Sequence, residues 1–271
     1  MRADLHMHTV NSDGVYTVGE VVDMAKRAGL DYIAVTDHDN FTDTTEFRHS
    51  IKTIYGIELS TTHNGEAIHV LGYFKERPPK WFVDKLEEFK KVRLERALRM
   101  LELIDEHFGI KLDPKFVYEA NSITRGSIGR EIVKQAEGKY TKSYVFKNFI
   151  GHGCKAYIPA LKIETEVGIK MIKDAGGLAV LAHPMLYKTE NMMEVIKMGF
   201  DGVEAIYPHF HEDIQKYRDL AGKYQIRFIT GGSDFHNLVG PDDGSNHGNI
   251  GDSYIEGNDL IKFLGELGYE R

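Results

Sequence analysis

Short apolar runs that alternate with amphipathic segments constrain the fold of this 271-residue chain more than any other feature. The spacing predicts strands at 2–8, 32–36, 54–60, 67–73, 178–182, 202–206 and 227–230, and helices at 18–28, 164–175, 190–198, 212–224 and 259–267. Gly29 follows the first of these helices, where a C-cap glycine is expected. Strands that alternate with helices form a parallel sheet covered by helices, so we predict an α/β fold with a closed or nearly closed barrel.

The stretch 78–158 interrupts this alternation. Apolar residues at helical spacing predict a long helix at 81–108, and shorter helical segments follow at 114–120, 127–136 and 142–149. The stretch holds 16 Lys and Arg against 11 Asp and Glu, whereas the rest of the chain holds 18 against 30. We therefore predict a basic helical insertion at 78–158 between two strands of a domain formed by 1–77 and 159–271.

Composition excludes several classes of protein. The formal charge of −7 argues against a general nucleic-acid binder, and the single Cys154 excludes an intramolecular disulfide framework and a cysteine-based zinc finger. No apolar run approaches the roughly 20 residues that a membrane span requires, and strand-like sequence follows Met1 too closely for a signal peptide. We expect a soluble, cytoplasmic protein without a membrane partner, and the sequence does not predict its oligomeric state.

Histidines and acidic residues gather at the ends of the predicted strands. His6 and His8 are two residues apart and project from one face of their strand, while Leu5 and Met7 are expected to point the other way. The remaining members of this set are Asp13, His38, Glu58, His69, His183, Asp234 and His236. One His-x-His is weak evidence, but six histidines and three acids at the strand ends of a barrel predict a catalytic site for zinc, manganese or iron.

These residues lie in motifs that follow one another along nearly the whole chain. The motifs are Asp4-Leu5-His6-Met7-His8, Ser12-Asp13-Gly14, Thr36-Asp37-His38, Gly56-Ile57-Glu58, His69-Val70-Leu71-Gly72-Tyr73, Ala182-His183-Pro184 and Gly232-Ser233-Asp234-Phe235-His236. Together they resemble the polymerase-and-histidinol-phosphatase (PHP) family. The resemblance implies a distorted (β/α)7 barrel, three divalent metal ions (Mn, Fe or Zn) and phosphoesterase activity.

The resemblance also implies how the metal ligands are shared. His6, His8, Glu58 and Asp234 are expected to bind one metal ion. Glu58 is expected to bridge to a second ion held by His69 and His183. The third ion is assigned to Asp13, His38 and His236.

The insertion resembles that of PHP phosphoesterases that act on nucleotides, including 3′,5′-nucleoside bisphosphate phosphatases and a 5′→3′ exoribonuclease. Those proteins usually carry a Gly-Arg-Pro-His-like segment, whereas Thr124-Arg125-Gly126-Ser127 keeps the arginine and lacks the proline and histidine. Arg125 is the main candidate for binding a phosphate, since a guanidinium matches two phosphate oxygens, and a solvated surface arginine is the alternative. Arg130 and Tyr157, the latter in the segment that returns to the barrel, are further substrate-binding candidates.

The hypothesised reaction is hydrolysis of a phosphomonoester of a small nucleotide, with a hydroxide that bridges two metal ions as the nucleophile. His209 and His211 follow the 202–206 strand, and one of them could protonate the leaving oxygen or contact the substrate instead. Asp37 is expected to orient the neighbouring His38. We interpret the histidines at 63, 107, 152 and 247 as surface residues.

Three alternatives remain open at this point. The same centre could serve a 5′→3′ exoribonuclease that acts on short RNA, or a histidinol-phosphate phosphatase, although the basic insertion favours a nucleotide. A regulatory PHP module without catalysis is disfavoured because every ligand position holds a suitable residue. The basic insertion could contact a second phosphate or a nucleic-acid backbone, or its lysines could serve only the solubility of a helical lid.

Overall fold

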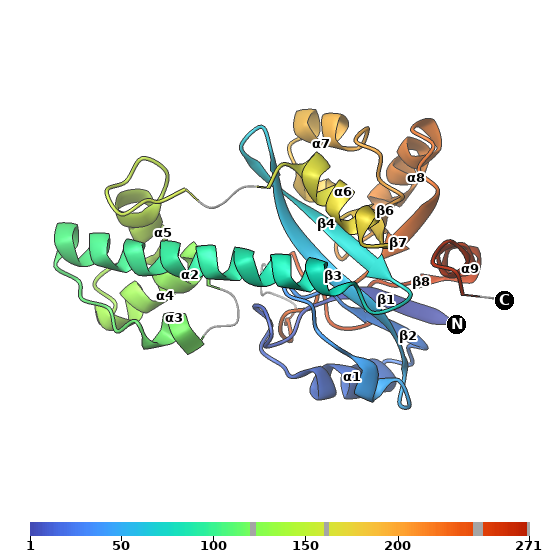
Figure 1. Cartoon of the computed structure of the whole chain (residues 1–271), viewed down its shortest axis with the longest axis horizontal. Helices are drawn as coiled ribbons and strands as arrows, with labels where there is room; N and C mark the ends of the chain where they lie inside the picture. The colour runs from blue at the N-terminus through green and yellow to red at the C-terminus, as the bar shows by residue number, and fades with distance from the viewer. Residues whose placement is uncertain (120–122, 160–162, 241–245, 270–271) are drawn as a thin grey trace. The chain divides into compact units, whose positions relative to one another are not determined.

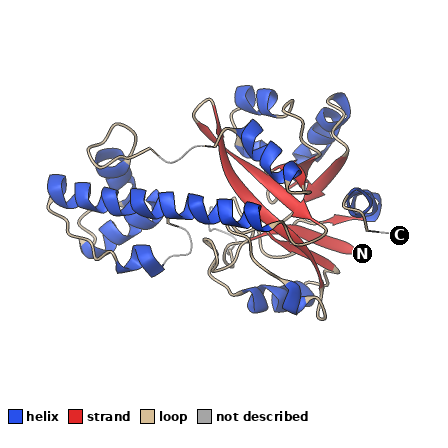
Figure 2. Cartoon of the chain, viewed as in Figure 1, coloured by secondary structure: helices blue, strands red, loops and turns tan. Residues whose placement is uncertain are grey.

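The computed structural model describes residues 1–119, 123–159, 163–240 and 246–269. The chain divides into two compact units, Met1–Leu86 with Lys162–Arg271, and Glu87–Leu161. The strands belong to the first unit, and the described part of the second unit is helical (Figure 1, Figure 2). No helix within the described ranges combines the length and the apolar character needed to cross a membrane.

Eight strands of the first unit form one sheet, in the order β7-β6-β5-β4-β3-β2-β1-β8. The strands are β1 (Arg2–Met7), β2 (Tyr32–Val35), β3 (Lys52–His63), β4 (Glu66–Phe74), β5 (Leu178–Leu181), β6 (Gly202–Ile206), β7 (Phe228–Gly231) and β8 (Ile255–Glu256). After β7 the chain returns to β1, where the His8 N–H donates to the Phe235 carbonyl at 2.8 Å. The sheet is therefore a nearly closed barrel, which confirms the predicted α/β barrel fold.

The expectation of a parallel sheet is only partly correct. β1, β2 and β3 are parallel, as are β5, β6 and β7, but β4 is antiparallel to both of its neighbours and β8 is antiparallel to β1. Asn64 and Gly65, with φ of 48° and 80°, connect β3 directly to β4. Two residues with positive φ form a tight hairpin turn and leave no length for a crossover helix.

Helices cover the outside of the barrel and one of its ends. They are α1 (Val18–Arg27), α6 (Thr165–Asp174), α7 (Thr189–Val195), α8 (Ile214–Lys223) and α9 (Gly257–Glu266). α1 begins at a capping box in which the Thr17 hydroxyl accepts from the Glu20 N–H and the Glu20 side chain accepts from the Thr17 N–H. α9 packs Leu260 and Phe263 against the ends of the strands where β1, β2 and β7 begin. The opposite ends of these strands carry the histidines.

β1 departs from simple alternation, and this changes where Leu5 lies. The register of β1 against β2 shifts between Asp4 and Met7, as in a β-bulge. Leu5 consequently packs with the interior cluster that contains Tyr73, whereas Met7 packs with the residues under α1. The expectation that Leu5 and Met7 share a face is wrong, because a bulge re-aims the side chains that follow it.

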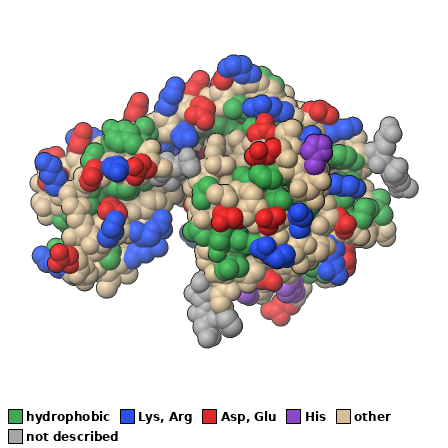
Figure 3. Space-filling view, turned by 90° about the horizontal axis from the view of Figure 1, so that it is seen from below, with side chains coloured by type: hydrophobic (Ala, Val, Ile, Leu, Met, Phe, Trp, Pro, Cys, Tyr) green, Lys and Arg blue, Asp and Glu red, His purple; other side chains and the backbone are tan. Residues whose placement is uncertain are grey.

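The described part of the second unit consists of helices. Its elements are α2 (Lys80–Phe108), which begins in the first unit, α3 (Lys115–Glu119), α4 (Arg125–Gln135) and α5 (Lys142–Val145), followed by a π-helical turn at Phe146–Ile150. They enclose a core of their own, which includes Met100, Ile104, Ile128, Ile132 and Phe149. The last residue of the helix expected at 114–120 lies outside the described residues. Basic and acidic side chains are interspersed on the face of the protein in Figure 3.

We expect the Gly232→Ala variant to be strongly destabilised, because β1 and the end of β7 meet at this glycine. A Cβ on Gly232 would lie 2.4 Å from the His6 Cβ and 2.5 Å from the His6 nitrogen. Such overpacking against backbone costs about 1–3 kcal/mol or more. Gly222→Ala in α8 is the control, since nothing lies within 4 Å of the added methyl group. Equal melting temperatures of the two variants would contradict this account of barrel closure.

Candidate metal centre

Six histidines meet at the end of the barrel opposite α9. His6 lies on β1, and His8 directly after it. His38, His183 and His236 follow β2, β5 and β7, while His69 lies on the antiparallel β4. The closest rings, those of His8 and His236, have centroids 4.1 Å apart, and the His38 and His69 centroids are 4.9 Å apart. The structure therefore brings together all six histidines that the sequence singled out.

Glu58 lies at the centre of these histidines and is only 1% exposed. Its Oε2 lies 3.1–3.2 Å from the ring nitrogens of three of them, His6 Nε2, His8 Nε2 and His38 Nδ1. Its Oε1 lies 2.8 Å from His69 Nδ1 and 3.0 Å from His183 Nε2. The hairpin explains part of this arrangement, because β3 and β4 pair Ser60 with His69 and so place Glu58 and His69 on one face as diagonal neighbours.

Two aspartates extend the cluster. Asp234 Oδ1 lies 3.2 Å from His6 Nε2 and 3.1 Å from His8 Nε2. Asp13 Oδ1 lies 3.2 Å from His236 Nε2. The donor atoms form overlapping groups that could each hold a metal ion. Three of these groups are His6, His8, Glu58 and Asp234; His38, Glu58 and His69; and His8, Asp13, His38 and His236.

Buried polar atoms without hydrogen-bond partners show that the cluster fits metal ions. Among the described residues, seven such atoms belong to it: His6 Nε2, His8 Nε2, His38 Nδ1, Glu58 Oε2, His69 Nδ1, His183 Nδ1 and Asp234 Oδ1. Each unsatisfied buried group is costly, and native proteins leave few of them. Nitrogen and oxygen donors that converge without thiolate suit catalytic zinc, manganese or iron.

The charges of the cluster are strongly coupled. Burial alone disfavours charge on His6, but the carboxylates of Glu204, Asp234 and Glu58 override it and raise the pKa of His6 well above its ordinary value. Burial also disfavours charge on His8, but the nearby carboxylates of Asp234 and Glu58 outweigh it and raise the pKa of His8 to about 10. His38 differs, since burial outweighs the nearby carboxylates and lowers its pKa to about 4. His38 is therefore neutral at pH 7 and can offer a ring lone pair.

We expect binding of Mn²⁺ to the metal-free protein to release protons at pH 7. The raised pKa values keep His6 and His8 protonated, and a histidine must be neutral to bind a metal. Metal affinity should therefore fall as the pH decreases below about 10, the pKa of His8, because protons then compete with the metal ion for the ring nitrogens. Calorimetric titrations in two buffers with different ionisation enthalpies measure the released protons. Identical heats in both buffers would contradict the assignment of His6 and His8 as ligands.

Glu204 on β6 is a member of the site that we did not predict. Its carboxylate accepts from His6 Nδ1 at 3.0 Å and from the His183 backbone N–H at 2.8 Å, and it is fully buried. The first contact fixes the His6 ring so that Nε2 faces Glu58. A glutamate between Val203 and Ala205 in an apolar strand was the available signal, because such a residue is almost never buried without a partner.

Strained backbone accompanies two of the clustered residues. His183 has a φ of 24° and Asp234 a φ of 51°, both in the region that side chains other than glycine rarely adopt. The hydrogen bond from the His183 N–H to Glu204 holds His183 in place. At the second, Asp234 Oδ2 accepts from the Tyr207 hydroxyl at 2.7 Å. Backbone strain of this kind persists where several surrounding contacts fix a residue in its conformation, and such strained residues are common at functional sites.

Two other catalytic candidates, Asp37 and His211, do not have the contacts that we expected. Asp37 accepts hydrogen bonds from the Thr9 backbone N–H at 2.7 Å and from the hydroxyls of Thr9, Ser12 and Thr42, so it organises the loop after β1 rather than His38. His211 is exposed in the turn before α8 and lines a cavity with Arg218 and Asp259. The structure does not bring His211 into the cluster.

His247 requires the opposite correction, because it is not a simple surface residue. Its Nδ1 lies 3.0 Å from Asp234 Oδ2, and its ring centroid lies 4.1 Å from that of His236. His209 is exposed and its Nε2 lies 3.4 Å from the His247 carbonyl oxygen. His247 had no predicted strand beside it, so sequence spacing could not connect it with the cluster.

The substrate-binding candidates lie in the second unit. Arg125 begins α4, and its guanidinium carbon lies 5.5 Å from the centroid of the Tyr157 ring. Burial and the charge of Arg125 lower the pKa of Arg96, whose Nε donates to the Ile158 carbonyl at 2.8 Å. Arg130 is exposed and donates to Ser127 at 3.4 Å. Arg125 and Tyr157 therefore form a pair, with Arg96 as an unpredicted neighbour.

Comparison with protein-family models agrees with the geometry of this cluster. The PHP domain model matches residues 4–232. The chain belongs to the PHP family. Together with the histidine and carboxylate cluster, membership makes this PHP protein a metal-dependent phosphoesterase, a hydrolase of phosphate esters. This confirms the family and the enzyme class that the motifs predicted.

Known PHP proteins similar to this one differ in their named substrates. A 5′-3′ exoribonuclease from Haemophilus influenzae is 29% identical over 249 residues, which cover 86% of this chain and 89% of that protein. A 3′,5′-nucleoside bisphosphate phosphatase from Chromobacterium violaceum is 27% identical over 248 residues, 86% of each chain. The structure of a metal-dependent phosphoesterase from Bifidobacterium adolescentis is 26% identical, with a TM-score of 0.75 over 99% of this chain and 96% of that one.

Proposed function

We propose that this protein removes a phosphate from a small nucleotide that carries two phosphates, such as a 3′,5′-nucleoside bisphosphate. The observation that carries the proposal is the convergence of orphaned donor atoms on Glu58. The similarity to the Chromobacterium violaceum phosphatase supports this substrate class.

In the proposed site the chain's own residues hold and orient three divalent metal ions. His6, His8, Glu58 and Asp234 would hold one, Glu58 with His69 and His183 a second, and Asp13, His38 and His236 a third. When bound, such ions supply a nucleophile from water at neutral pH and neutralise phosphoryl oxygens. Glu204 keeps the His6 ring in place, and Tyr207 orients Asp234 by donating to its other oxygen.

His247 is our candidate for protonating the leaving oxygen, with His209 as the alternative. Its Nδ1 bonds to Asp234, and an imidazole can carry a proton on either ring nitrogen. The ring is partly exposed, with 34% of the side chain accessible, so a substrate can reach it. This assignment replaces His211, which lies away from the cluster.

Arg125 is proposed to bind the phosphate that is not hydrolysed. A guanidinium donates to two phosphate oxygens at once, and the Tyr157 ring beneath it limits the orientations that it can adopt. Arg96 is a second guanidinium near Arg125, because burial and the charge of Arg125 both lower the pKa of Arg96.

The Arg125→Ala variant should raise the KM for a bisphosphate by about 10- to 100-fold, because a charge-assisted phosphate contact is worth about 1.5–3 kcal/mol. The KM for a monophosphate, which lacks the second phosphate, should change far less. Arg99→Ala is the control, since Arg99 is exposed on α2 and pairs with Glu102 at 2.5 Å. An equal loss on both substrates would contradict the role of Arg125.

The proposal is tested by phosphate release from adenosine 3′,5′-bisphosphate, from a 5′-phosphorylated RNA oligomer and from histidinol phosphate, with Mn²⁺-loaded protein. We expect release from the bisphosphate to be fastest. Activity on histidinol phosphate alone, or none on any of the three with metal confirmed bound, would contradict the nucleotide assignment.

A 5′→3′ exoribonuclease is the second candidate, favoured by the similarity to the Haemophilus influenzae enzyme and by the positive balance of the insertion. In this case the oligomer would yield mononucleotides one at a time from its 5′ end. Chromatography of the oligomer products distinguishes this result from release of phosphate alone.

A further inference from the structure

A pocket at the α9 end of the barrel has no part in the metal centre. It is lined by residues that begin β2 and β3 and by residues on and after α9, and its volume is about 840 Å³. Tyr32 and Lys52 are the first residues of their strands, whereas the metal centre lies at the opposite strand ends. Ligand pockets in proteins typically measure about 300–1,000 Å³. This cavity, the α9 pocket, is therefore large enough for a small molecule.

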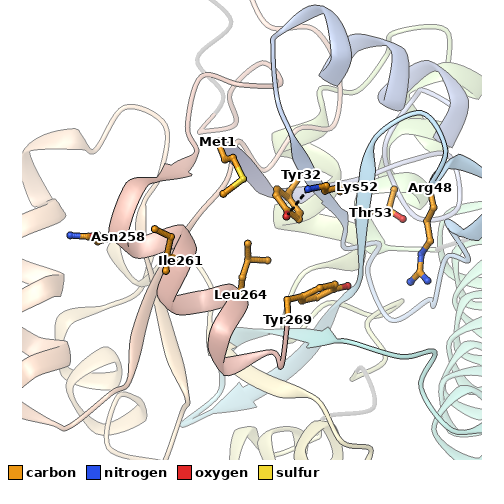
Figure 4. Close-up of a pocket in the computed structure, with 9 residues that line it drawn as sticks. All are labelled: Met1, Tyr32, Arg48, Lys52, Thr53, Asn258, Ile261, Leu264 and Tyr269. Atoms are coloured by element: carbon orange, nitrogen blue, oxygen red, sulfur yellow. Dashed lines mark hydrogen bonds between the residues drawn. The ribbon is translucent and has the colours of Figure 1, made fainter. Parts of the chain in front are cut away.

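The walls of the α9 pocket have two different characters. Ile261 and Leu264 on α9 form an aliphatic wall, and the ring of Tyr269 lies between that wall and Arg48 (Figure 4). Leu264 is buried, whereas Ile261 is 40% exposed. An exposed aliphatic residue beside a cavity offers an apolar surface that a ligand can cover.

Positive charge lies on the other side of the pocket. Lys52 donates to the Tyr32 hydroxyl at 3.1 Å, and Arg48 lies over the Tyr55 ring with its guanidinium carbon 4.3 Å from the centroid. Both contacts are with neutral groups. The charge of Arg48 also acts on Asp43, whose pKa is lowered by its hydrogen bonds from Thr45 and by the charges of Arg77, its ion-pair partner, and Arg48. None of the described lining residues is acidic. The side of the pocket formed by Arg48 and Lys52 thus favours an anion.

We propose that the α9 pocket binds a small amphiphilic anion, a molecule with an apolar body and one anionic group. The body lies against Ile261, Leu264 and Tyr269, and the anionic group lies at Arg48 and Lys52. An aromatic carboxylate and the anion of a medium-chain fatty acid share this chemistry. The proposal does not depend on the reaction at the metal centre, because the two sites are at opposite ends of the barrel.

Paired fluorescent probes test the charge and the apolar body separately. 8-Anilinonaphthalene-1-sulfonate carries the anion, and N-phenyl-1-naphthylamine has the same rings without it. We expect the Arg48→Gln/Lys52→Gln variant to lose about tenfold in affinity for the sulfonate and less than about twofold for the uncharged probe. Ile261→Asp should weaken both probes. Lys26→Gln, an exposed lysine of α1 that pairs with Asp23, should weaken neither.

Competition between the sulfonate probe and unlabelled anions then shows which kind of anion the α9 pocket binds. Displacement of the sulfonate by 1-naphthoate or by octanoate supports the proposal and tells which body the pocket prefers. Displacement by neither anion overturns it, as does a sulfonate affinity that is the same in the wild type and the double variant. Thermal unfolding of each variant shows that a lost affinity does not come from a lost fold.

Discussion

The Asp234→Asn variant is expected to lose at least about 10³-fold in phosphate release while keeping its circular dichroism spectrum. The loss corresponds to the several kcal/mol that a correctly held metal ion contributes to a phosphoryl transition state. Asp234 Oδ1 faces His6 and His8, and Oδ2 accepts from Tyr207 and His247. Asparagine offers no negative charge to the metal position, and its amide nitrogen cannot accept from the Tyr207 hydroxyl as the Asp234 carboxylate does.

Asp252→Asn is the matched control for this variant. Asp252 is an exposed aspartate that accepts from the Asn249 N–H at 2.7 Å, outside the cluster. We expect it to keep both its metal content and its activity. Full activity of Asp234→Asn with unchanged metal content would mean that the group of His6, His8, Glu58 and Asp234 is not a metal site.

The Glu204→Gln variant is expected to bind metal and turn over substrate about 10- to 100-fold less well, as found when a partner that orients a metal ligand is changed. Glutamine keeps the size of the side chain but removes the negative charge beside His6 Nδ1. The His6 ring would then be free to rotate, and its Nε2 would no longer be held toward Glu58 and Asp234.

Asp201→Asn separates this effect from a general loss of stability. Asp201 is a buried carboxylate just before β6 that accepts from the Ala179 N–H at 2.9 Å, much as Glu204 accepts from the His183 N–H. Its cationic partners, Arg227 and Lys173, lie outside the cluster. We expect Asp201→Asn to lower the melting temperature without changing metal affinity. A Glu204→Gln protein that melts earlier but binds metal normally would show that Glu204 is only structural.

Much of the fold was predictable because its local signals agree with its tertiary structure. The strand at 202–206 and the helices α1, α6 and α9 lie where apolar spacing and capping residues put them, within a few residues. The strand β4 was predicted at 67–73, but its antiparallel direction was not, although Asn64-Gly65 is a strong hairpin signal. The β1 bulge that turns Leu5 inward has no local signal, since it depends on how β1 meets its neighbours.

Some residues of the candidate site could also be predicted from the sequence, and others could not. Residues that end a strand, such as His38 and His183, could be placed on one face of the barrel by topology alone. Glu204 left a signal, a glutamate inside an apolar strand, but its partner His6 lies about 200 residues away in the chain. His247 had no predicted strand beside it, so the sequence did not connect it with Asp234. Asp37 was given a role by its neighbour in sequence, whereas its carboxylate bonds to hydroxyls from two loops.

The most direct test of a metal-dependent phosphoesterase is to titrate Mn²⁺ into metal-stripped protein and to measure bound metal and phosphate release from adenosine 3′,5′-bisphosphate in the same samples. We predict no release without metal, a rise in proportion to bound Mn²⁺, and no recovery in Asp234→Asn. Full phosphate release by the stripped protein, or by Asp234→Asn, would contradict the account.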